Sequence, residues 1–316
     1  MPAKVFIDGH EGTTGLRIRD WLAWRGDIEL LVLPHRERKD PAARRAAIEA
    51  ADVAVLCLPD DAAREAACWA AERGTRVIDA STAHRVAPEW VYGLPELEPG
   101  HEERIRNAER VANPGCYASA FVLLVRPLVD AGAIAAETPL VCHALSGYSG
   151  GGRPLIERWE NPDQPLTSLP YEAPYALQRV HKHIPEMMRY GRLTKEPYFT
   201  PAVGPFRCGM RVQLPLHREA LRIPAGAIAG IFSRRYGEQP FVRVVPYEIS
   251  TPMEENTLSP LACNDTNRIE IHVIPHPSGH VLLAALLDNL GKGAAGVAIQ
   301  NLNLMLGLPH TTGLPG

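Results

Sequence analysis

The feature that most constrains the fold is an alternation of short apolar runs and helix-forming segments in the first third of the chain. The runs "KVFI", "IELLVLPH", "DVAVLCLP" and "RVIDAS" have the length and composition of strands, and the segments between them carry helical patterns. Strands that alternate with helices in this way pair in parallel and are covered by helices on both faces. The pattern predicts a doubly wound α/β domain.

A glycine-rich turn joins the first predicted strand to the first predicted helix. Gly9, Gly12 and Gly15 form a G-x-x-G-x-x-G pattern, and Thr13 and Thr14 place two hydroxyl groups beside it. Glycines at such a turn let the backbone approach a pyrophosphate, whose charge then rests at a helix N-terminus. An ordinary strand–helix turn is the alternative, but the alternating pattern around it favours dinucleotide binding.

The loop after the second predicted strand indicates which dinucleotide is bound. NAD-binding domains commonly place an acidic residue there to hold the ribose hydroxyls, whereas this strand runs into "PHRERK", residues 34–39. Guanidinium and ammonium groups attract the 2′-phosphate that a carboxylate would repel. We therefore predict NADP, with Arg36 and Arg38 as ligands of the 2′-phosphate. A solvated basic loop would leave the preference undecided.

One cysteine has the setting of a nucleophile. In "NPGCYASA", residues 113–120, Cys116 lies between a Pro-Gly turn and an apolar helical run that ends near Gly132. A thiol in the first turn of a helix lies at the positive end of the helix dipole, which favours the reactive thiolate. Cys116 is therefore the candidate nucleophile. The cysteines that lack this setting are Cys57, Cys68, Cys142, Cys208 and Cys263.

A nucleophilic thiol needs a proton partner, which is usually a histidine. In "HKHIPEM", His181 and His183 stand two residues apart, just before a predicted helix. In an extended segment, residues i and i+2 point to the same face, so both imidazoles are expected to line one cleft. A polar loop before a helix is the alternative. The pattern H-x-H also occurs in zinc sites, but no third ligand stands at a familiar spacing, so we predict no metal.

Two features are candidates for binding an anion. The segment "ALSGYSGGGRPL", residues 144–155, contains Ser146, Gly147, Ser149 and Arg153 and is expected to form a flexible turn dense in backbone donors. Such a turn forms either a nest for an anion or a simple hairpin. Arg85 follows the fourth predicted strand, and its guanidinium suits a phosphate or a carboxylate.

The composition fits a cytoplasmic enzyme of two associated domains. The chain has 316 residues and a formal net charge of -3 without a long basic block, so nucleic acid is not an expected partner. No signal peptide or membrane-length apolar run is present, and no two cysteines form a C-x-x-C pair. The cysteines are therefore expected to be reduced thiols in a cytoplasm, and no membrane association is expected.

Eight motifs in this order resemble the N-acetyl-gamma-glutamyl-phosphate reductase family, in its second, shorter type. They are "FIDGHEGTTGLRI", "DASTAHR", "YGLPEL", "NPGCYASA", "SGYSGGGR", "HKHIPEM", "PAVGPFRCGM" and "DNLGKGAAGVAIQNLNLMLG". The resemblance implies a fold like that of aspartate-semialdehyde and glyceraldehyde-3-phosphate dehydrogenases. An NADP-binding Rossmann domain would cover residues 1–117 and be completed by a C-terminal helix within 288–316. A catalytic and dimerisation domain with a mixed sheet would cover residues 118–287.

The same resemblance implies a reaction and a set of site residues. Cys116 would attack an acyl phosphate to give a thioester, and NADPH would reduce the thioester to the semialdehyde, a step of arginine biosynthesis. A histidine would protonate the oxygen, with His181 preferred because the proline that starts the helix crowds His183. The resemblance adds Ser81 and Asn289 as cofactor contacts. Its substrate contacts are Arg85, Asn113, Ser146, Gly147, Ser149 and Arg153.

The family resemblance also implies assembly as a homodimer or a homotetramer. Two other functions stay open at this point. One is another acyl-phosphate reductase of the same fold, of the aspartate-semialdehyde dehydrogenase kind. The other is a non-catalytic NADP-binding redox sensor, which would need the nucleotide turn but not the histidine pair.

Overall fold

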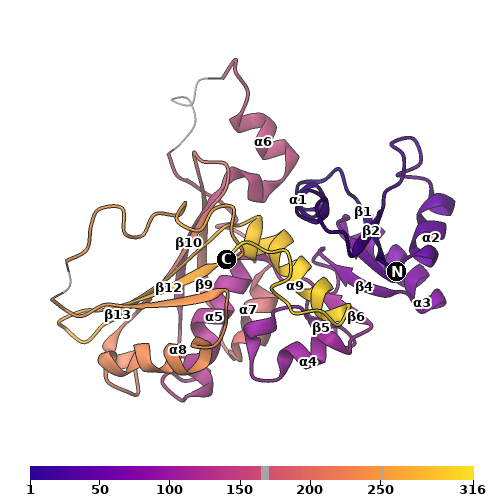
Figure 1. The fold of residues 1–316 in the computed structure, drawn as a ribbon. Helices are drawn as coiled ribbons and strands as arrows, with labels where there is room; N and C mark the ends of the chain where they lie inside the picture. The colour runs from indigo at the N-terminus through magenta and orange to yellow at the C-terminus, as the bar shows by residue number, and fades with distance from the viewer. Residues whose placement is uncertain (165–170, 251) are drawn as a thin grey trace. The chain divides into compact units, whose positions relative to one another are not determined.

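The computed structural model describes residues 1–164, 171–250 and 252–316, which form two compact units (Figure 1). Unit 1 consists of Met1–Gly115 with Ala294–Leu314, and unit 2 consists of Cys116–Gly293 with Pro315–Gly316. Two roles stay predictions: NADP binding by residues 1–117 with 288–316, and catalysis and dimerisation by residues 118–287.

Unit 1 contains the doubly wound parallel sheet that the alternating pattern predicts. Its strands lie in the order β2-β1-β3-β4-β6-β5, and every pair in it is parallel. The first four strands coincide with the four apolar runs, so that expectation is confirmed. The strands are β1 (Ala3–Asp8), β2 (Ile28–Leu31), β3 (Val53–Leu56), β4 (Arg76–Asp79), β5 (Val91–Tyr92) and β6 (Arg110–Ala112).

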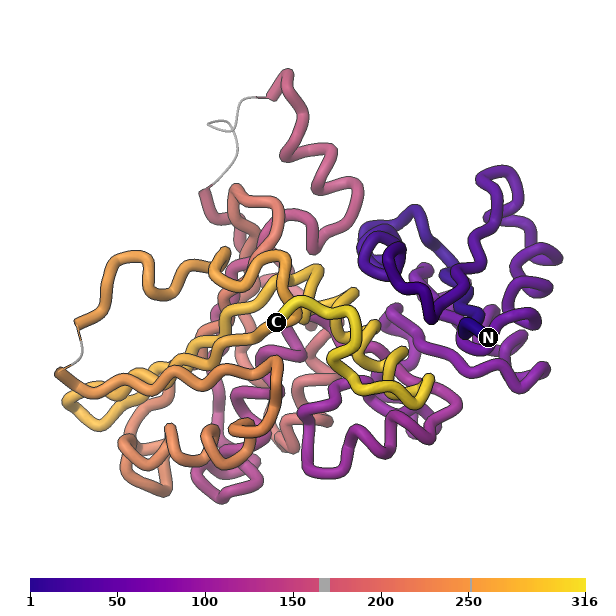
Figure 2. Tube along the Cα trace, in the orientation of Figure 1, coloured from indigo at the N-terminus to yellow at the C-terminus, as the bar shows by residue number. Residues whose placement is uncertain are grey.

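Helices cover both faces of this sheet because the strand residues alternate between two apolar clusters. Val5 and Ile7 of β1 pack with α1, α4 and α9, whereas Phe6 packs with α2 and α3. The C-terminal helix α9 thus joins the core of the N-terminal strands (Figure 2). A strand buried on both faces needs apolar side chains throughout, as β3 has in "VAVL". The helices are α1 (Thr13–Leu22), α2 (Pro41–Ala50), α3 (Asp60–Arg73), α4 (His101–Arg106) and α9 (Gly296–Met305).

Unit 2 is built on a mixed sheet with the strand order β11-β12-β13-β10-β7-β9-β8. The pairs β7–β9 and β11–β12 are parallel and the remaining pairs are antiparallel, so the expected mixed sheet is confirmed. The strands are β7 (Val141–Gly147), β8 (Ala173–Pro174), β9 (Tyr198–Gly204), β10 (Met210–Leu216), β11 (Val242–Pro246), β12 (Ile269–Pro275) and β13 (Val281–Leu287).

Helix α5 (Cys116–Asp130) forms the centre of unit 2. Every residue from Tyr117 to Leu128 is buried, and α5 contacts strands β10 and β13 and the helices α7 and α8. A helix that is apolar on all sides is stable only when it is enclosed by other elements. The other helices of this unit are α6 (Arg153–Trp159), α7 (Ile184–Gly191) and α8 (Ile228–Tyr236).

The C-terminal helix begins later than the sequence suggests. The resemblance implies a C-terminal helix within residues 288–316, but α9 begins only at Gly296 and follows a π-helical turn, Gly291–Ala295. The amide of Gly293 donates to the carbonyl of Asp288, five residues earlier, at 2.9 Å. The Asp288 carboxylate also accepts from the Leu290 amide at 2.8 Å. These bonds fix a wider turn in place of regular α-helical pairing.

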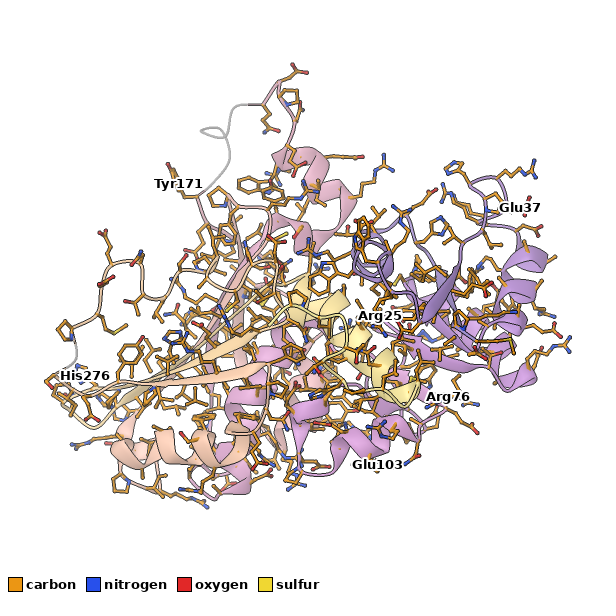
Figure 3. All side chains as sticks on the ribbon, in the orientation of Figure 1. Arg25, Glu37, Arg76, Glu103, Tyr171 and His276 are labelled. Atoms are coloured by element: carbon orange, nitrogen blue, oxygen red, sulfur yellow. The ribbon has the colours of Figure 1, made fainter. Side chains whose placement is uncertain are left out.

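The Arg76 side chain ties three segments of unit 1 together (Figure 3). Its guanidinium donates to the carbonyls of Arg106, Ala108 and Met305, at the ends of α4 and α9. Replacing Arg76 with Leu leaves these carbonyls without a charged donor, so we expect the free energy of unfolding to fall by about 2–3 kcal/mol. Chemical denaturation measures this change.

Arg73→Leu is the control, because Arg73 forms only an exposed ion pair with Glu49 at 3.3 Å. This variant should lose less than about 0.5 kcal/mol. Equal losses in the two variants would contradict the role given to Arg76.

Candidate active site

The glycine turn of unit 1 has the tight geometry that a nucleotide site requires. Gly9 has a φ of +86°, and a Cβ at this position would lie 2.2 Å from the carbonyl oxygen of Cys57. Gly12 donates to the Gly9 carbonyl at 3.0 Å and immediately precedes α1. Thr13, Thr14 and Gly15 are the first three residues of that helix. The backbone therefore presents a helix N-terminus beside an open turn, which suits a phosphate group.

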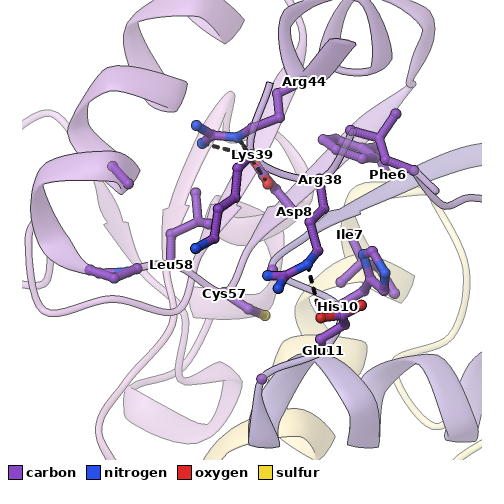
Figure 4. A pocket seen from close by; sticks show the side chains of 15 residues that line it. Phe6, Ile7, Asp8, His10, Glu11, Arg38, Lys39, Arg44, Cys57 and Leu58 are labelled. Carbon is purple, nitrogen blue, oxygen red and sulfur yellow. Dashed lines mark hydrogen bonds and ion pairs between the residues drawn. The ribbon is translucent and has the colours of Figure 1, made fainter. Parts of the chain in front are cut away.

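A pocket of about 330 Å³ lies against this turn (Figure 4). It is lined by the end of β1, the glycine turn, the loop after β2 and the loop after β3. Arg38 and Lys39 reach it from the loop after β2, and Arg44 reaches it from α2. The predicted basic segment thus contributes side chains to the same pocket as the glycine turn, and the pocket suits a phosphate-bearing ribose.

Two of the three cations in the pocket are paired with carboxylates. Arg44 contacts Asp8 at 2.9 Å, and Arg38 contacts Glu11 at 3.0 Å. A hydrogen bond from His35, together with the charge of Arg38, holds the pKa of Glu11 below its usual range. Within the described part of the chain, Lys39 has no carboxylate partner. Lys39 is therefore the pocket cation that is free to bind an anion without breaking an ion pair.

Arg36 and Ser81, two other expected cofactor contacts, lie elsewhere in unit 1. The Arg36 side chain is 85% exposed, is bonded to Glu37 at 2.9 Å and does not line the pocket. Ser81 follows β4, and its hydroxyl donates to the Asp79 carboxylate at 2.7 Å. These positions leave the predicted cofactor contacts of Arg36 and Ser81 untested.

Arg85 and Asn113 are engaged within unit 1. Arg85 is buried and donates to the carbonyls of Asn113 and Ala80, at 3.1 and 3.2 Å. The Asn113 amide donates to the Ala294 carbonyl and accepts from Asn301. These bonds hold the segment that precedes Cys116, so both residues have a structural role whether or not they also bind substrate.

Cys116 is the first residue of α5, so the predicted turn-then-helix setting is confirmed. The thiol is partly exposed, as a nucleophile must be. Gly293 approaches it so closely that a Cβ there would lie 2.8 Å from Cys116 Cβ. Only glycine leaves room for this approach.

Three other thiols lie in surroundings that disfavour the thiolate form. Burial raises the pKa of Cys57 to about 12 and that of Cys263 to about 11, and it raises the pKa of Cys142 further. These thiols stay protonated at neutral pH and are poor nucleophiles.

Next to Cys116, an aromatic cluster collects the two predicted histidines. Tyr117 has its ring 5.8 Å from both His181 and His183, and the two imidazoles are 4.8 Å apart. Tyr175 Oη lies 3.4 Å from His181 Nε2 and 3.3 Å from Tyr117 Oη. Burial is the main cause that raises the pKa of Tyr117, and a charge on Cys116 raises it further. Unit 2 therefore holds both imidazoles beside Tyr117, the residue that follows Cys116.

The backbone at His181 and His183 follows the alternative, a loop before a helix, and not an extended segment. Residues 181–183 form a turn in which the Ile184 amide donates to the His181 carbonyl at 2.9 Å. His183 has helical angles and precedes α7 directly. The rings lie close together because the His183 amide also donates to His181 Nδ1 at 3.1 Å, not because strand geometry aligns them.

Residues 144–155 do not form the flexible turn that the sequence predicts. Ser146 and Gly147 end strand β7, a 3₁₀ turn covers Tyr148–Gly151, and α6 begins at Arg153. The amides of residues 147, 148 and 149 donate to the carbonyls of residues 209, 206 and 207. These donors are therefore not available as an anion nest.

Asn289 belongs to unit 2 and fixes this segment. Its side chain donates to Ser149 Oγ at 3.0 Å and accepts from the Gly209 amide at 2.8 Å. Arg153 is 86% exposed and is bonded to Glu157 at 2.6 Å. Ser146 Oγ donates to the Gly147 carbonyl at 3.2 Å. The roles of these residues toward cofactor or substrate stay predictions.

Sequence reasoning missed four residues of these sites. Tyr117 adjoins Cys116 in the sequence, so its proximity was available from the sequence. Glu11 lies inside the glycine motif and Lys39 inside the basic segment, which are weak signals. No local pattern marks Tyr175 as a site residue, because it reaches the histidines only through the long-range pairing of β8 with β9.

The described ranges contain neither a group of metal-ligating side chains nor a membrane-spanning helix. Across residues 1–164, 171–250 and 252–316, no three His, Cys, Asp or Glu side chains are grouped so that they could hold a metal ion. In the same part of the chain, no helix has the length and apolar character needed to cross a membrane.

Comparison with known proteins decides the family. Residues 34–107 match the model of the semialdehyde dehydrogenase NAD binding domain, and residues 116–289 match that of the dimerisation domain. An N-acetyl-gamma-glutamyl-phosphate reductase of Burkholderia cenocepacia is 46% identical over 96% of this chain and 97% of its own. One of Brucella ovis is 46% identical over 97% and 100%. The chain belongs to the N-acetyl-gamma-glutamyl-phosphate reductase family.

Solved structures with similar folds support the α/β fold of this chain. Aspartate semialdehyde dehydrogenase II from Vibrio cholerae, complexed with ASA, has a TM-score of 0.74 at 17% identity and covers 97% of this chain and 98% of its own. The enzyme from Candida albicans with NADP has a TM-score of 0.63 at 15% identity, with coverages of 97% and 99%. The expected α/β fold class is therefore confirmed.

The charged side chains of the pocket in unit 1 allow a test of whether the protein prefers NADPH to NADH. We expect Lys39→Met to weaken NADPH binding about tenfold, because one charge-assisted contact to the 2′-phosphate is lost. NADH lacks that phosphate and should bind unchanged. Titration of the fluorescence of either reduced dinucleotide measures both affinities.

Lys4→Met is the matched control, since Lys4 is exposed on β1 and does not line the pocket. It should change neither affinity by more than about twofold. Equal weakening of NADPH and NADH by Lys39→Met would contradict the assignment.

Proposed function

We propose that this protein is an NADPH-dependent reductase of arginine biosynthesis. It converts N-acetyl-gamma-glutamyl phosphate to N-acetylglutamate 5-semialdehyde and releases phosphate. The observation that carries the proposal is a partly exposed cysteine at the start of a buried helix, followed by a tyrosine that contacts two histidines. The chain also matches reductases of that name over nearly its full length.

Cys116 is the nucleophile of the proposed reaction. Its thiolate forms a C–S bond with the acyl carbon, and the bond from that carbon to the phosphate oxygen breaks. The product of this step is a thioester on Cys116, and phosphate departs before reduction. Sulfur suits the next step as well, because a thiolate leaves a tetrahedral centre far more readily than a serine alkoxide does.

The glycine turn and the pocket of unit 1 hold the dinucleotide. Gly9 and the start of α1 suit the pyrophosphate, and Arg38 and Lys39 suit the 2′-phosphate. When bound, NADPH supplies the hydride that takes the thioester to the oxidation level of an aldehyde.

The histidine pair supports the chemistry at the acyl oxygen. When the C–S bond of the reduced adduct breaks, the aldehyde is released and the Cys116 thiolate is regenerated. His181 and His183 provide the hydrogen-bonding and proton-transferring groups for these steps. For the substrate carboxylate and phosphate, the proposed contacts are the side chains of Arg85, Asn113, Ser146, Ser149 and Arg153.

The family model that matches residues 116–289 describes a dimerisation domain. We propose that the enzyme works as a homodimer or homotetramer in the cytoplasm. Its substrate is a small molecule, and neither nucleic acid nor a membrane takes part.

The reaction is best tested in reverse, because the acyl phosphate is labile. Purified protein is mixed with NADP, N-acetylglutamate semialdehyde and phosphate, and reduced cofactor is followed by its absorbance. We expect turnover that requires phosphate and that Cys116→Ser lowers by at least about 10³-fold. Aspartate semialdehyde should be a poor substrate.

The controls separate the remaining functions. Cys142→Ser tests a buried thiol with no proposed role and should keep its turnover. Faster turnover with aspartate semialdehyde would favour the related dehydrogenase activity. NADP binding without turnover of either aldehyde would favour a redox sensor.

A further inference from the structure

The pocket of unit 1 contains a carboxylate that no step of the proposed function uses. Glu11 reaches the pocket from the glycine turn, and Arg38 reaches it from the loop after β2 (Figure 4). Glu11 Oε2 lies 3.0 Å from Arg38 Nε, and Glu11 Oε1 lies 2.7 Å from His35 Nδ1. An ionised carboxylate only accepts, so both nitrogens donate to it. Glu11 therefore ties the glycine turn to the basic loop, with one oxygen for each donor.

The three side chains form a closed group. Arg38 Nε also lies 3.2 Å from His35 Nδ1, so Glu11, Arg38 and His35 meet at one point. Within residues 1–164, 171–250 and 252–316, the side chains of Glu11 and Arg38 form hydrogen bonds or ion pairs only with each other and with His35. The position of the Arg38 guanidinium thus depends on these two neighbours.

The second ion pair of the pocket is of a different kind. Asp8 and Arg44 are both buried, and Arg44 binds the Asp8 carboxylate through Nε and Nη2, at 3.0 and 2.9 Å. The Arg44 guanidinium also lies over the ring of Trp69, 5.0 Å from its centroid. Opening this pair would leave a buried charge without its partner, which is strongly unfavourable. The Asp8–Arg44 pair is therefore a permanent part of the pocket wall.

The Glu11–Arg38 pair can be opened at little cost. The two side chains are 40% and 33% exposed, and an exposed ion pair contributes little to stability. An anion that enters the pocket can therefore take Arg38 from Glu11, whereas it cannot take Arg44 from Asp8.

A phosphate group needs the same donor that Glu11 holds. Phosphate and carboxylate oxygens both accept charge-assisted hydrogen bonds from a guanidinium, and two anions on one donor repel each other. The hydrogen bond from His35 is the main cause that holds the pKa of Glu11 below its usual range, so Glu11 is ionised at neutral pH. A 2′-phosphate must therefore compete with a charged Glu11 for Arg38, but it meets no such competitor at Lys39.

We propose that Glu11 is a specificity-determining residue of this pocket, whose carboxylate competes with the 2′-phosphate for Arg38. A dinucleotide that lacks this phosphate has no carboxylate to displace, so Glu11 reduces the preference for NADPH over NADH. This role rests on the proposed function, which takes NADPH as its cofactor.

The first test compares two nucleotides that differ only in the phosphate concerned. Adenosine 2′,5′-bisphosphate and adenosine 5′-phosphate are titrated by calorimetry into the wild-type protein and Glu11→Gln. Glutamine keeps the shape of the side chain and removes its charge. We expect the bisphosphate to bind about fivefold more tightly to Glu11→Gln, because an exposed pair leaves its cation free for roughly a fifth of the time. Binding of the 5′-phosphate should change by less than about twofold.

The second test shows whether Glu11 acts through Arg38. Arg38→Met should weaken binding of the bisphosphate, and adding Glu11→Gln to this variant should restore no more than about twofold, because nothing is left to compete for. An equal gain from Glu11→Gln in both backgrounds would mean that Glu11 repels the phosphate directly, and it would overturn the proposal.

Glu49→Gln is the matched control. It removes the same charge from an exposed ion pair of unit 1, with Arg73 at 3.3 Å, and Glu49 does not line the pocket. Its affinities should stay within about twofold of the wild type. Unchanged thermal unfolding of each variant shows that the fold is kept.

Two results separate this role from the proposed function. If the wild-type protein prefers the bisphosphate but Glu11→Gln binds it equally or more weakly, Glu11 does not compete for Arg38, and the NADP site stands without this role. If the wild-type protein binds both nucleotides equally, the NADP site itself is wrong, and the role of Glu11 fails with it. These affinities do not depend on turnover, so an inactive protein in the reverse assay would leave both conclusions unchanged.

Discussion

The burial of helix α5 is the constraint on which the rest of unit 2 depends. An apolar helix enclosed on all sides has one stable position, and its first two residues are Cys116 and Tyr117. The packing of Phe121, Leu124 and their neighbours therefore sets where the thiol and the phenol lie. The close approach of Gly293 to Cys116 leaves little freedom for the residue proposed as the nucleophile.

Around this fixed point, a backbone amide helps to orient one of the two histidines of unit 2. In the familiar serine-protease triad, an aspartate holds the histidine tautomer. In this protein, a main-chain amide of a turn contacts the equivalent nitrogen of His181. An amide carries no net charge, so it orients the ring without stabilising an imidazolium.

Local sequence patterns predicted the parts of the fold that depend on local forces. The strand–helix alternation, the glycine turn and the start of α5 at Cys116 follow from apolar periodicity and turn residues within about 20 positions. The H-x-H pair shows the limit of this reasoning. Its residues were correctly expected to share a neighbourhood, but the backbone there is a turn, because a side-chain nitrogen competes for the His183 amide.

Long-range pairing explains what the sequence could not reveal. Tyr175 reaches His181 through the pairing of β8 with β9, and the amides of residues 147–149 are occupied by the segment 206–209. Among the basic residues after β2, only side-chain direction distinguishes Arg36, which is exposed, from Lys39, which lines the pocket. The spacing of residues along the sequence reveals neither the strand pairing nor the side-chain directions.

The position of α9 has a consequence for synthesis on the ribosome. Residues 296–305 complete the apolar cluster that covers Val5, Ile7, Val53 and Val55, so the face of the first sheet that α1 and α4 also cover stays partly open until almost the whole chain has been made. A nascent Rossmann sheet in that state exposes apolar surface to solvent and to other chains. The final step of folding therefore joins the two ends of the sequence, and a truncated chain that lacks α9 would leave the nucleotide-binding sheet open to aggregation.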